Sequence, residues 1–137
     1  MKFKVIAVIS LLLIALAACQ SDKEIEFARY YSAGSVVYQT RCQNCHGSDG
    51  KGLAALIPAL TNSRRLKAIK STLPCLVRYG SKSAMNALGR SAYGEMPANN
   101  IPPMEVAQVL TYITNSFGNK MGTITADQVE QHLKACR

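Results

Sequence analysis

Five consecutive residues, Cys42-Gln43-Asn44-Cys45-His46, restrict this chain more than any other part of it. On a helical turn, two thiols at positions i and i+3 face the same side, and the imidazole of His46 stands beside them. In a C-x-x-C-H sequence the two thiols add to the two vinyl groups of one porphyrin, and the histidine binds its iron. The motif predicts one covalently attached haem c, held by Cys42 and Cys45, with His46 as the proximal ligand.

Three other interpretations of the motif are weaker. A thioredoxin-like redox pair also uses C-x-x-C, but it needs a βαβ setting, and the chain has no alternating strand pattern. A structural zinc site needs four nitrogen or sulfur ligands, whereas the remaining candidates, Cys75, His132 and Cys136, are scattered along the sequence. A disulfide within the motif would not require the histidine. Haem attachment is therefore favoured.

The N-terminus has the pattern of an export signal. A basic start, Met1-Lys2-Phe3-Lys4, precedes an apolar run over residues 5–17. The end of this run, Leu16-Ala17-Ala18-Cys19, resembles the lipobox of bacterial lipoproteins, in which the cysteine is lipidated and becomes the first mature residue. We expect residues 1–18 to be a lipoprotein signal peptide and Cys19 to anchor the protein to a membrane facing the periplasm, inner or outer membrane undecided. The alternative is ordinary cleavage, which would leave Cys19 as a free thiol.

The charge argues against one class of partner. The formal net charge of +8 falls to +6 when Lys2 and Lys4 are removed with the signal, and two haem propionates would lower it to about +4. Nucleic-acid binding is the wrong inference for an exported protein, so we expect protein redox partners and no small-molecule substrate. Seven basic residues between positions 64 and 90 form either a solvated face or a docking patch: Arg64, Arg65, Lys67, Lys70, Arg78, Lys82 and Arg90.

The rest of the chain predicts an all-α domain of about four to five helices with long loops around one haem. Residues 19–33 are polar and are expected to form a tether that becomes helical or packs on the domain near its end. The domain covers residues 34–137, with a helical extension from about residue 120. Helices are predicted over residues 34–45, 64–70, 74–79 (stopped by Gly80) and 103–117, and a last helix after Thr125, which begins a capping box. Residues 47–62 and 81–102 are predicted to be mostly loop.

Residues 34 to about 119 resemble a class I, mitochondrial-type monohaem cytochrome c domain. In that family a proline twelve residues after the proximal histidine accepts a hydrogen bond from the ligand, and Pro58 stands twelve residues after His46. Leu60 resembles the leucine that packs on the haem. Gly34 and Tyr38 resemble the small and aromatic residues of the N-terminal helix that cross the C-terminal helix near an aromatic, here Tyr112.

The same resemblance indicates the sixth iron ligand. Gly94-Glu95-Met96-Pro97 is similar to the family's Met-Pro loop, so Met96 is the expected ligand. Met85, in the same region, is the second choice, and Met104 is expected to be core or exposed. Ligation by His132, the only other histidine, is disfavoured.

Two cysteines remain after lipid and haem attachment. In an exported chain such thiols are expected to pair, which predicts a Cys75–Cys136 disulfide. The alternative is two buried free thiols.

With a histidine and a methionine on the iron, the resemblance implies a one-electron carrier and not an enzyme. Residues 109–119 also look like the last helix of cytochrome domains attached to exported quinoprotein dehydrogenases and copper nitrite reductases. Two alternatives remain: a haem-based ligand sensor, and a cytochrome subunit fixed to a dehydrogenase or reductase complex. The donor, the acceptor, the reduction potential and the oligomeric state are not specified by the sequence.

Overall fold

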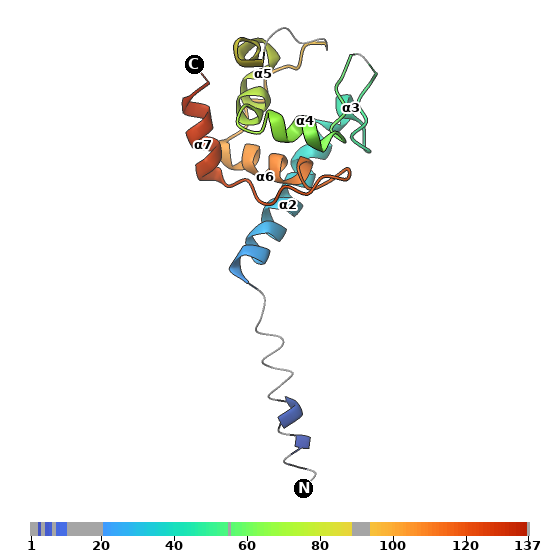
Figure 1. The fold of residues 1–137 in the computed structure, drawn as a ribbon, viewed down its shortest axis with the longest axis vertical. Helices are drawn as coiled ribbons and strands as arrows, with labels where there is room; N and C mark the ends of the chain where they lie inside the picture. The colour runs from blue at the N-terminus through green and yellow to red at the C-terminus, as the bar shows by residue number, and fades with distance from the viewer. Residues whose placement is uncertain are drawn as a thin grey trace.

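A computed structural model describes residues 21–54, 56–82 and 94–136, the backbone of residues 83–88, and residues 3, 5, 6 and 8–10. From residue 21 onward the described chain forms six helices and one isolated bridge between Leu53 and Ile57. The helices are α2 (Asp22–Arg41), α3 (Gln43–His46), α4 (Ser63–Ala68), α5 (Leu73–Leu88), α6 (Pro103–Ile113) and α7 (Ala126–Lys134). The expected all-α class is confirmed (Figure 1).

The core forms where α2 crosses α6. A Cβ atom added to Gly34 of α2 would collide with the backbone carbonyl of Gln108 and lie 3.0 Å from Cβ of Tyr112, so only glycine permits this approach. One turn later the ring of Tyr38 lies 5.3 Å from that of Tyr112. The predicted contact among Gly34, Tyr38 and Tyr112 is confirmed. On α6, Val106 and Leu110 are almost fully buried beneath it.

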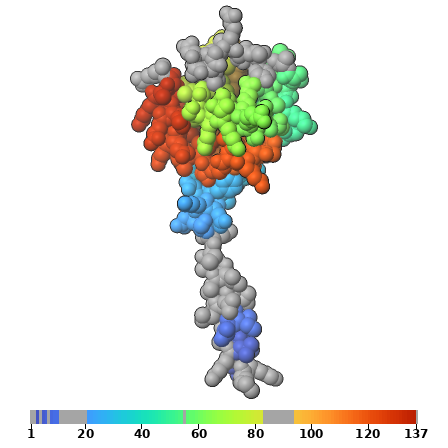
Figure 2. All heavy atoms as spheres, viewed as in Figure 1, coloured from blue at the N-terminus to red at the C-terminus, as the bar shows by residue number. Residues whose placement is uncertain are grey.

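Helix α2 begins earlier than expected. The polar segment that predicts a tether is helical from Asp22, and the first turns of the helix project from the domain (Figures 1 and 2). Phe27 and Tyr31 stack one turn apart, with ring centroids separated by 5.7 Å, and Tyr31 contacts Tyr112 of α6. Side chains spaced by four residues therefore extend the packed face toward the N-terminus.

Helix α5 corrects the expected loop over residues 81–102. The first helical stretch of α5 ends at Gly80 as predicted, because Gly80 has a φ of 76° and a ψ of 176°, and a second helical stretch follows it and runs to Leu88. The predicted stop at Gly80 is confirmed, and what the sequence did not indicate is that the chain re-enters a helix directly after it. Residues 94–102 have no regular secondary structure, as predicted.

The C-terminal part returns across α6 as a strap, defined here as residues 114–136. Helix α6 ends at Ile113, four residues before the predicted end, and the chain turns through Phe117 and Gly118, both with positive φ. The side chain of Thr125 accepts a hydrogen bond from the backbone N–H of Gln128, which completes the predicted capping box at α7. Beyond α7, Cys136 forms a disulfide with Cys75 of α5, with an S–S distance of 2.02 Å.

Cys19 lies outside the described residues. Among those that are described, no helix combines the length and the apolar character needed to cross a membrane.

Candidate haem site

The C-x-x-C-H motif occupies the break between α2 and α3. Helix α2 ends at Arg41, Cys42 caps the single turn of α3, and His46 is its last residue. The backbone N–H groups of Cys45 and His46 both donate to the carbonyl of Cys42, at 3.1 and 2.9 Å. This turn fixes both thiols and the imidazole on one short, hydrogen-bonded element. Cys42 and His46 are buried and Cys45 is exposed.

The ring of His46 is oriented by Pro58. Nδ1 of His46 lies 3.2 Å from the carbonyl oxygen of Pro58. Because a carbonyl can only accept, Nδ1 carries the proton, and the lone pair of a neutral ring then resides on Nε2. Burial lowers the pKa of His46, and the hydrogen bond to Pro58 opposes that effect. The neutral imidazole, with Nε2 available to a metal, is the form that this environment favours.

The two motif thiols are not joined to each other. Burial, together with the charge of Cys45, raises the pKa of Cys42 to about 11 against the opposing effect of Arg41. As free thiols, an inert buried Cys42 and an exposed Cys45 make a poor redox pair. The Cys75–Cys136 disulfide also removes both outlying thiols from the zinc interpretation. Where the chain is described, no three His, Cys, Asp or Glu side chains gather as a metal site.

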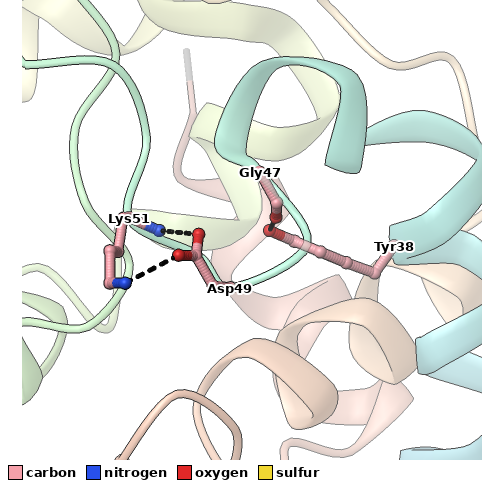
Figure 3. Close-up of polar contacts among 4 residues, drawn as sticks. All are labelled: Tyr38, Gly47, Asp49 and Lys51. Atoms are coloured by element: carbon pink, nitrogen blue, oxygen red, sulfur yellow. Dashed lines mark hydrogen bonds and ion pairs between the residues drawn. The ribbon is translucent and has the colours of Figure 1, made fainter.

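The loop after His46 is held at its start by an aromatic residue. The hydroxyl of Tyr38 donates a 2.6 Å hydrogen bond to the carbonyl of Gly47 (Figure 3). A few residues on, Asp49 accepts from the backbone N–H of Lys51 at 3.1 Å and pairs with its ammonium group at 2.9 Å. These contacts lower the pKa of Asp49 and raise that of Lys51. Figure 3 shows Tyr38 reaching from its helix toward the start of the loop.

Leu60 is fixed through both of its backbone groups. Its N–H donates to the carbonyl of Gly50 at 2.7 Å, and its carbonyl accepts from Nδ2 of Asn119 at 2.8 Å. Asn119, in the strap, is 2% exposed and also donates to the carbonyl of Ile113 at 3.1 Å. Leu60 is partly buried against the core. The strap therefore helps to set the position of the residue expected to pack on the haem.

Met96 lies in a segment tied to the Pro58 loop. The backbone N–H of Gly94 donates to the carbonyl of Leu56 at 2.8 Å, so the residue two before Met96 is bonded to the residue two before Pro58. The side chain of Met96 is partly buried against the core. The structure thus brings the expected ligand segment and the expected proline segment together.

The competing sixth ligands are placed as follows. Met104 is on the first turn of α6 and is 45% exposed. Met85 falls in the second half of α5, where side chains are outside the described part of the structure. His132 is a partly exposed residue of α7, and its backbone carbonyl lies 3.4 Å from Sγ of Cys136.

Sequence reasoning missed two residues that shape this site. Asn119 gives no motif, because an asparagine after a helix is typical of any turn. Ser81 follows a glycine in a segment that predicts loop, and its contact with Met96, described below, depends on tertiary structure. By contrast, Tyr38 is identified by the resemblance, although only as a helix-packing residue.

The chain is similar in sequence to known cytochromes c. The family model described as cytochrome c matches residues 31–116. The fructose dehydrogenase cytochrome subunit of Gluconobacter japonicus is 28% identical over 105 residues, which cover 72% of this chain and 21% of the relative. The cytochrome c subunit of alcohol dehydrogenase (quinone) from Komagataeibacter europaeus is 28% identical over 111 residues, which cover 70% of this chain and 21% of the relative. The chain thus spans about a fifth of the length of these relatives.

Proposed function

The chain belongs to the cytochrome c family, and we propose that it is a one-electron transfer protein whose single haem c is attached through Cys42 and Cys45 and ligated by His46 and Met96. Covalently bound haem c follows from the family, and it supplies a reversible one-electron couple. The observation that carries the proposal is the 3.2 Å contact between Nδ1 of His46 and the carbonyl of Pro58, which supports His46 as the proximal ligand. That contact occupies Nδ1 and would leave Nε2 free to bind the iron of a haem.

The protein residues around the motif would orient the His46 ring and exclude water from the haem. Pro58 fixes the His46 ring and makes it a stronger donor, because a hydrogen bond from Nδ1 increases the electron density on Nε2. Leu60, held by Gly50 and Asn119, is partly buried against the core and would supply apolar contact to the haem. A dry surrounding favours the less charged iron state and so raises the reduction potential.

Met96 would close the sixth position. The link from Gly94 to Leu56 supports Met96 over Met104, which lies on a different element and is half exposed. A thioether ligand raises the potential relative to nitrogen ligands and leaves no open site for substrate. This chemistry makes the chain an electron carrier and not an enzyme.

We further propose that the chain is exported and lipid-anchored through Cys19, with the haem domain passing electrons to protein partners. The relatives are cytochrome subunits of fructose and alcohol dehydrogenases, which favours a dehydrogenase as the donor. The basic surface, defined as Arg64, Arg65, Lys67 and Lys70 on and just after α4, is exposed. It lies away from the Asp22 end of α2 (Figures 1 and 2). The sequence contains no Asp or Glu from residue 50 to residue 94, so this surface suits an acidic protein face.

The absorption spectrum of the purified mature protein tests the ligand assignment. We expect a low-spin spectrum with a methionine–iron band that is lost in Met96→Ala and kept in Met104→Ala. A high-spin wild-type spectrum would overturn the carrier in favour of a ligand-binding sensor. A Met96→Ala variant that keeps the band would overturn Met96 as the ligand.

The second candidate function is a cytochrome subunit fixed in a dehydrogenase complex, which the names of the relatives favour. Extraction of membranes with mild detergent distinguishes the two. A free carrier elutes alone, whereas a fixed subunit elutes with a dehydrogenase in constant proportion. Acyl groups on Cys19, detected by mass spectrometry of the N-terminal peptide, test the anchor separately.

A further inference from the structure

The bend in α5 makes a two-way contact with the backbone of Met96. The N–H of Ser81 donates to the carbonyl of Met96 at 2.9 Å, and the N–H of Met96 donates to Oγ of Ser81 at 2.9 Å. Ser81 is therefore bonded to both backbone polar groups of one residue. We propose that Ser81 is a positioning residue that holds Met96 in place for the iron, an inference that rests on Met96 being the ligand.

The local backbone explains how a helix can make this contact. Gly80, at a φ of 76°, takes the N–H of Ser81 out of the helical hydrogen-bonding pattern and turns it toward Met96. A Cβ atom at Gly80 would lie 2.6 Å from the carbonyl oxygen of Met96 and 2.8 Å from the backbone nitrogen of Ala98. Only glycine combines this dihedral angle with this proximity. The backbone at Gly80 thus allows the Met96 segment to pack directly against α5.

The first half of α5 provides a firm base for Ser81. The backbone N–H of Asn99 donates to the carbonyl of Val77 at 3.2 Å, which ties the segment after Met96 to the same helix. Cys75, six residues before Ser81, is bonded covalently to Cys136. Ser81 itself is only 9% exposed, so water competes poorly for its hydroxyl. The contact therefore links Met96 to an anchored element and not to a free loop.

Holding the backbone matters because a methionine ligand is flexible and its thioether is a weak donor. The population of protein with Met96 displaced sets how readily an outside ligand reaches the iron, since the apparent affinity scales with that population. Each of the two hydrogen bonds between Ser81 and Met96 lowers the displaced population. Loss of the hydroxyl should raise it, with little effect on the other axial ligand.

The experiment uses the haem-loaded protein in its ferric state with imidazole as the probe. We expect Ser81→Ala to bind imidazole about fivefold more tightly than wild type, the size expected from the loss of one hydrogen bond. Ser81→Thr, which keeps the hydroxyl, should restore most of the wild-type affinity. Native-state hydrogen exchange of the Met96 amide, which needs no electron transfer, should accelerate about fivefold in Ser81→Ala.

Two variants serve as controls. Ser71→Ala removes an exposed hydroxyl from the turn before α5 and should change neither quantity. Tyr31→Phe removes a 2.9 Å side-chain hydrogen bond to Ser116 on another face, so it lowers stability without touching Met96. If Tyr31→Phe tightened imidazole binding as much as Ser81→Ala, the effect would be general destabilisation, and the proposal would be wrong.

Met96→Ala separates this inference from the proposed function. Loss of the methionine band in Met96→Ala with unchanged imidazole affinity in Ser81→Ala would refute the role of Ser81 alone. Retention of the band in Met96→Ala would refute the ligand assignment and, with it, the role of Ser81.

Discussion

The hydroxyl of Tyr38 lies 2.6 Å from the carbonyl oxygen of Gly47, the residue that follows the proximal histidine. Tyr38 is 1% exposed, and its ring packs against Tyr112 and Phe117 with centroids 5.3 Å away in each case. One side chain therefore joins the α2–α6 crossing to the loop beside the haem site. The consequences can be measured.

Stability should fall at alkaline pH through Tyr38. Burial, and then the charges of Cys42, Tyr112 and Asp49, raise the pKa of the Tyr38 phenol well above its ordinary value of 10.0. Because the folded protein holds this proton more tightly than the unfolded chain, the contribution is fully present below pH 10 and is lost progressively above it. Tyr38→Phe should cost about 1 kcal/mol at neutral pH and flatten the alkaline slope. Urea unfolding from pH 8 to 11 measures the unfolding free energy and its slope with pH. Tyr79→Phe, at an exposed position, is the control. Equal slopes in wild type, Tyr38→Phe and Tyr79→Phe would contradict the prediction.

Gly34→Ala should weaken the helix crossing. The added methyl group meets the carbonyl of Gln108, which is backbone and cannot rotate away. We expect a loss of about 1–3 kcal/mol in unfolding free energy, the usual cost of overpacking a core. Val36→Ala, two residues along the same helix at a side chain that is 60% exposed, is the matched control and should change stability little. A Gly34→Ala protein as stable as wild type would show that the two helices can separate freely.

Removing the Cys75–Cys136 bridge should destabilise the strap. The bridged residues are 61 apart, for which the chain-entropy account gives about 4 kcal/mol, with measured values commonly between about 2 and 5. The variant Cys75→Ser/Cys136→Ser should unfold at lower urea than wild type. Dithiothreitol should shift wild type to the midpoint of the variant and leave the variant unmoved. A variant that remained sensitive to dithiothreitol would point to another reducible bond.

The basic surface should accelerate reaction with anions. Reversing the charge of Arg64 and Lys67 removes attraction that acts over about 10 Å at 0.1 M salt. We expect reduction of hexacyanoferrate(III) to slow several-fold at low ionic strength, and the difference to shrink as salt is added. Reversing Lys120 and Lys134, two exposed residues at the strap, makes the same net change elsewhere. Equal slowing in both variants would mean that net charge, and not the basic surface, governs the rate.

Much of the site was predictable because its chemistry is local. The Cys42–His46 spacing fits one helical turn, and the capping box at Thr125 places a helix start within three residues. The motif and the capping box depend on short-range geometry, which a sequence expresses directly. Pro58 was identifiable only through the resemblance to the cytochrome c family, and its carbonyl does lie beside the ring of His46.

The features that were missed depend on tertiary contacts. Gly80 does interrupt α5 as its sequence pattern predicts, but neither the second helical stretch after it nor the hydrogen bonds that join Ser81 to Met96 at this break have a local sequence signal. The early start of α2 had a usable signal: Phe27, Tyr31, Gly34 and Tyr38 follow the helical period. The polar residues between these four positions favoured a tether instead. The helical signal was overlooked because the aromatic partner of Tyr31 is Tyr112 of α6, far along the chain.

The unbroken helix from Asp22 to Arg41 also fixes where the N-terminal end of α2 lies relative to the domain. At about 1.5 Å per residue, its first three turns fix the separation between residue 22 and Gly34 at roughly 18 Å, and they fix direction as well as distance. A coil of the same length would let the domain sample a sphere of orientations. In this helix, by contrast, the Asp22 end keeps one position and one direction relative to the core of the domain.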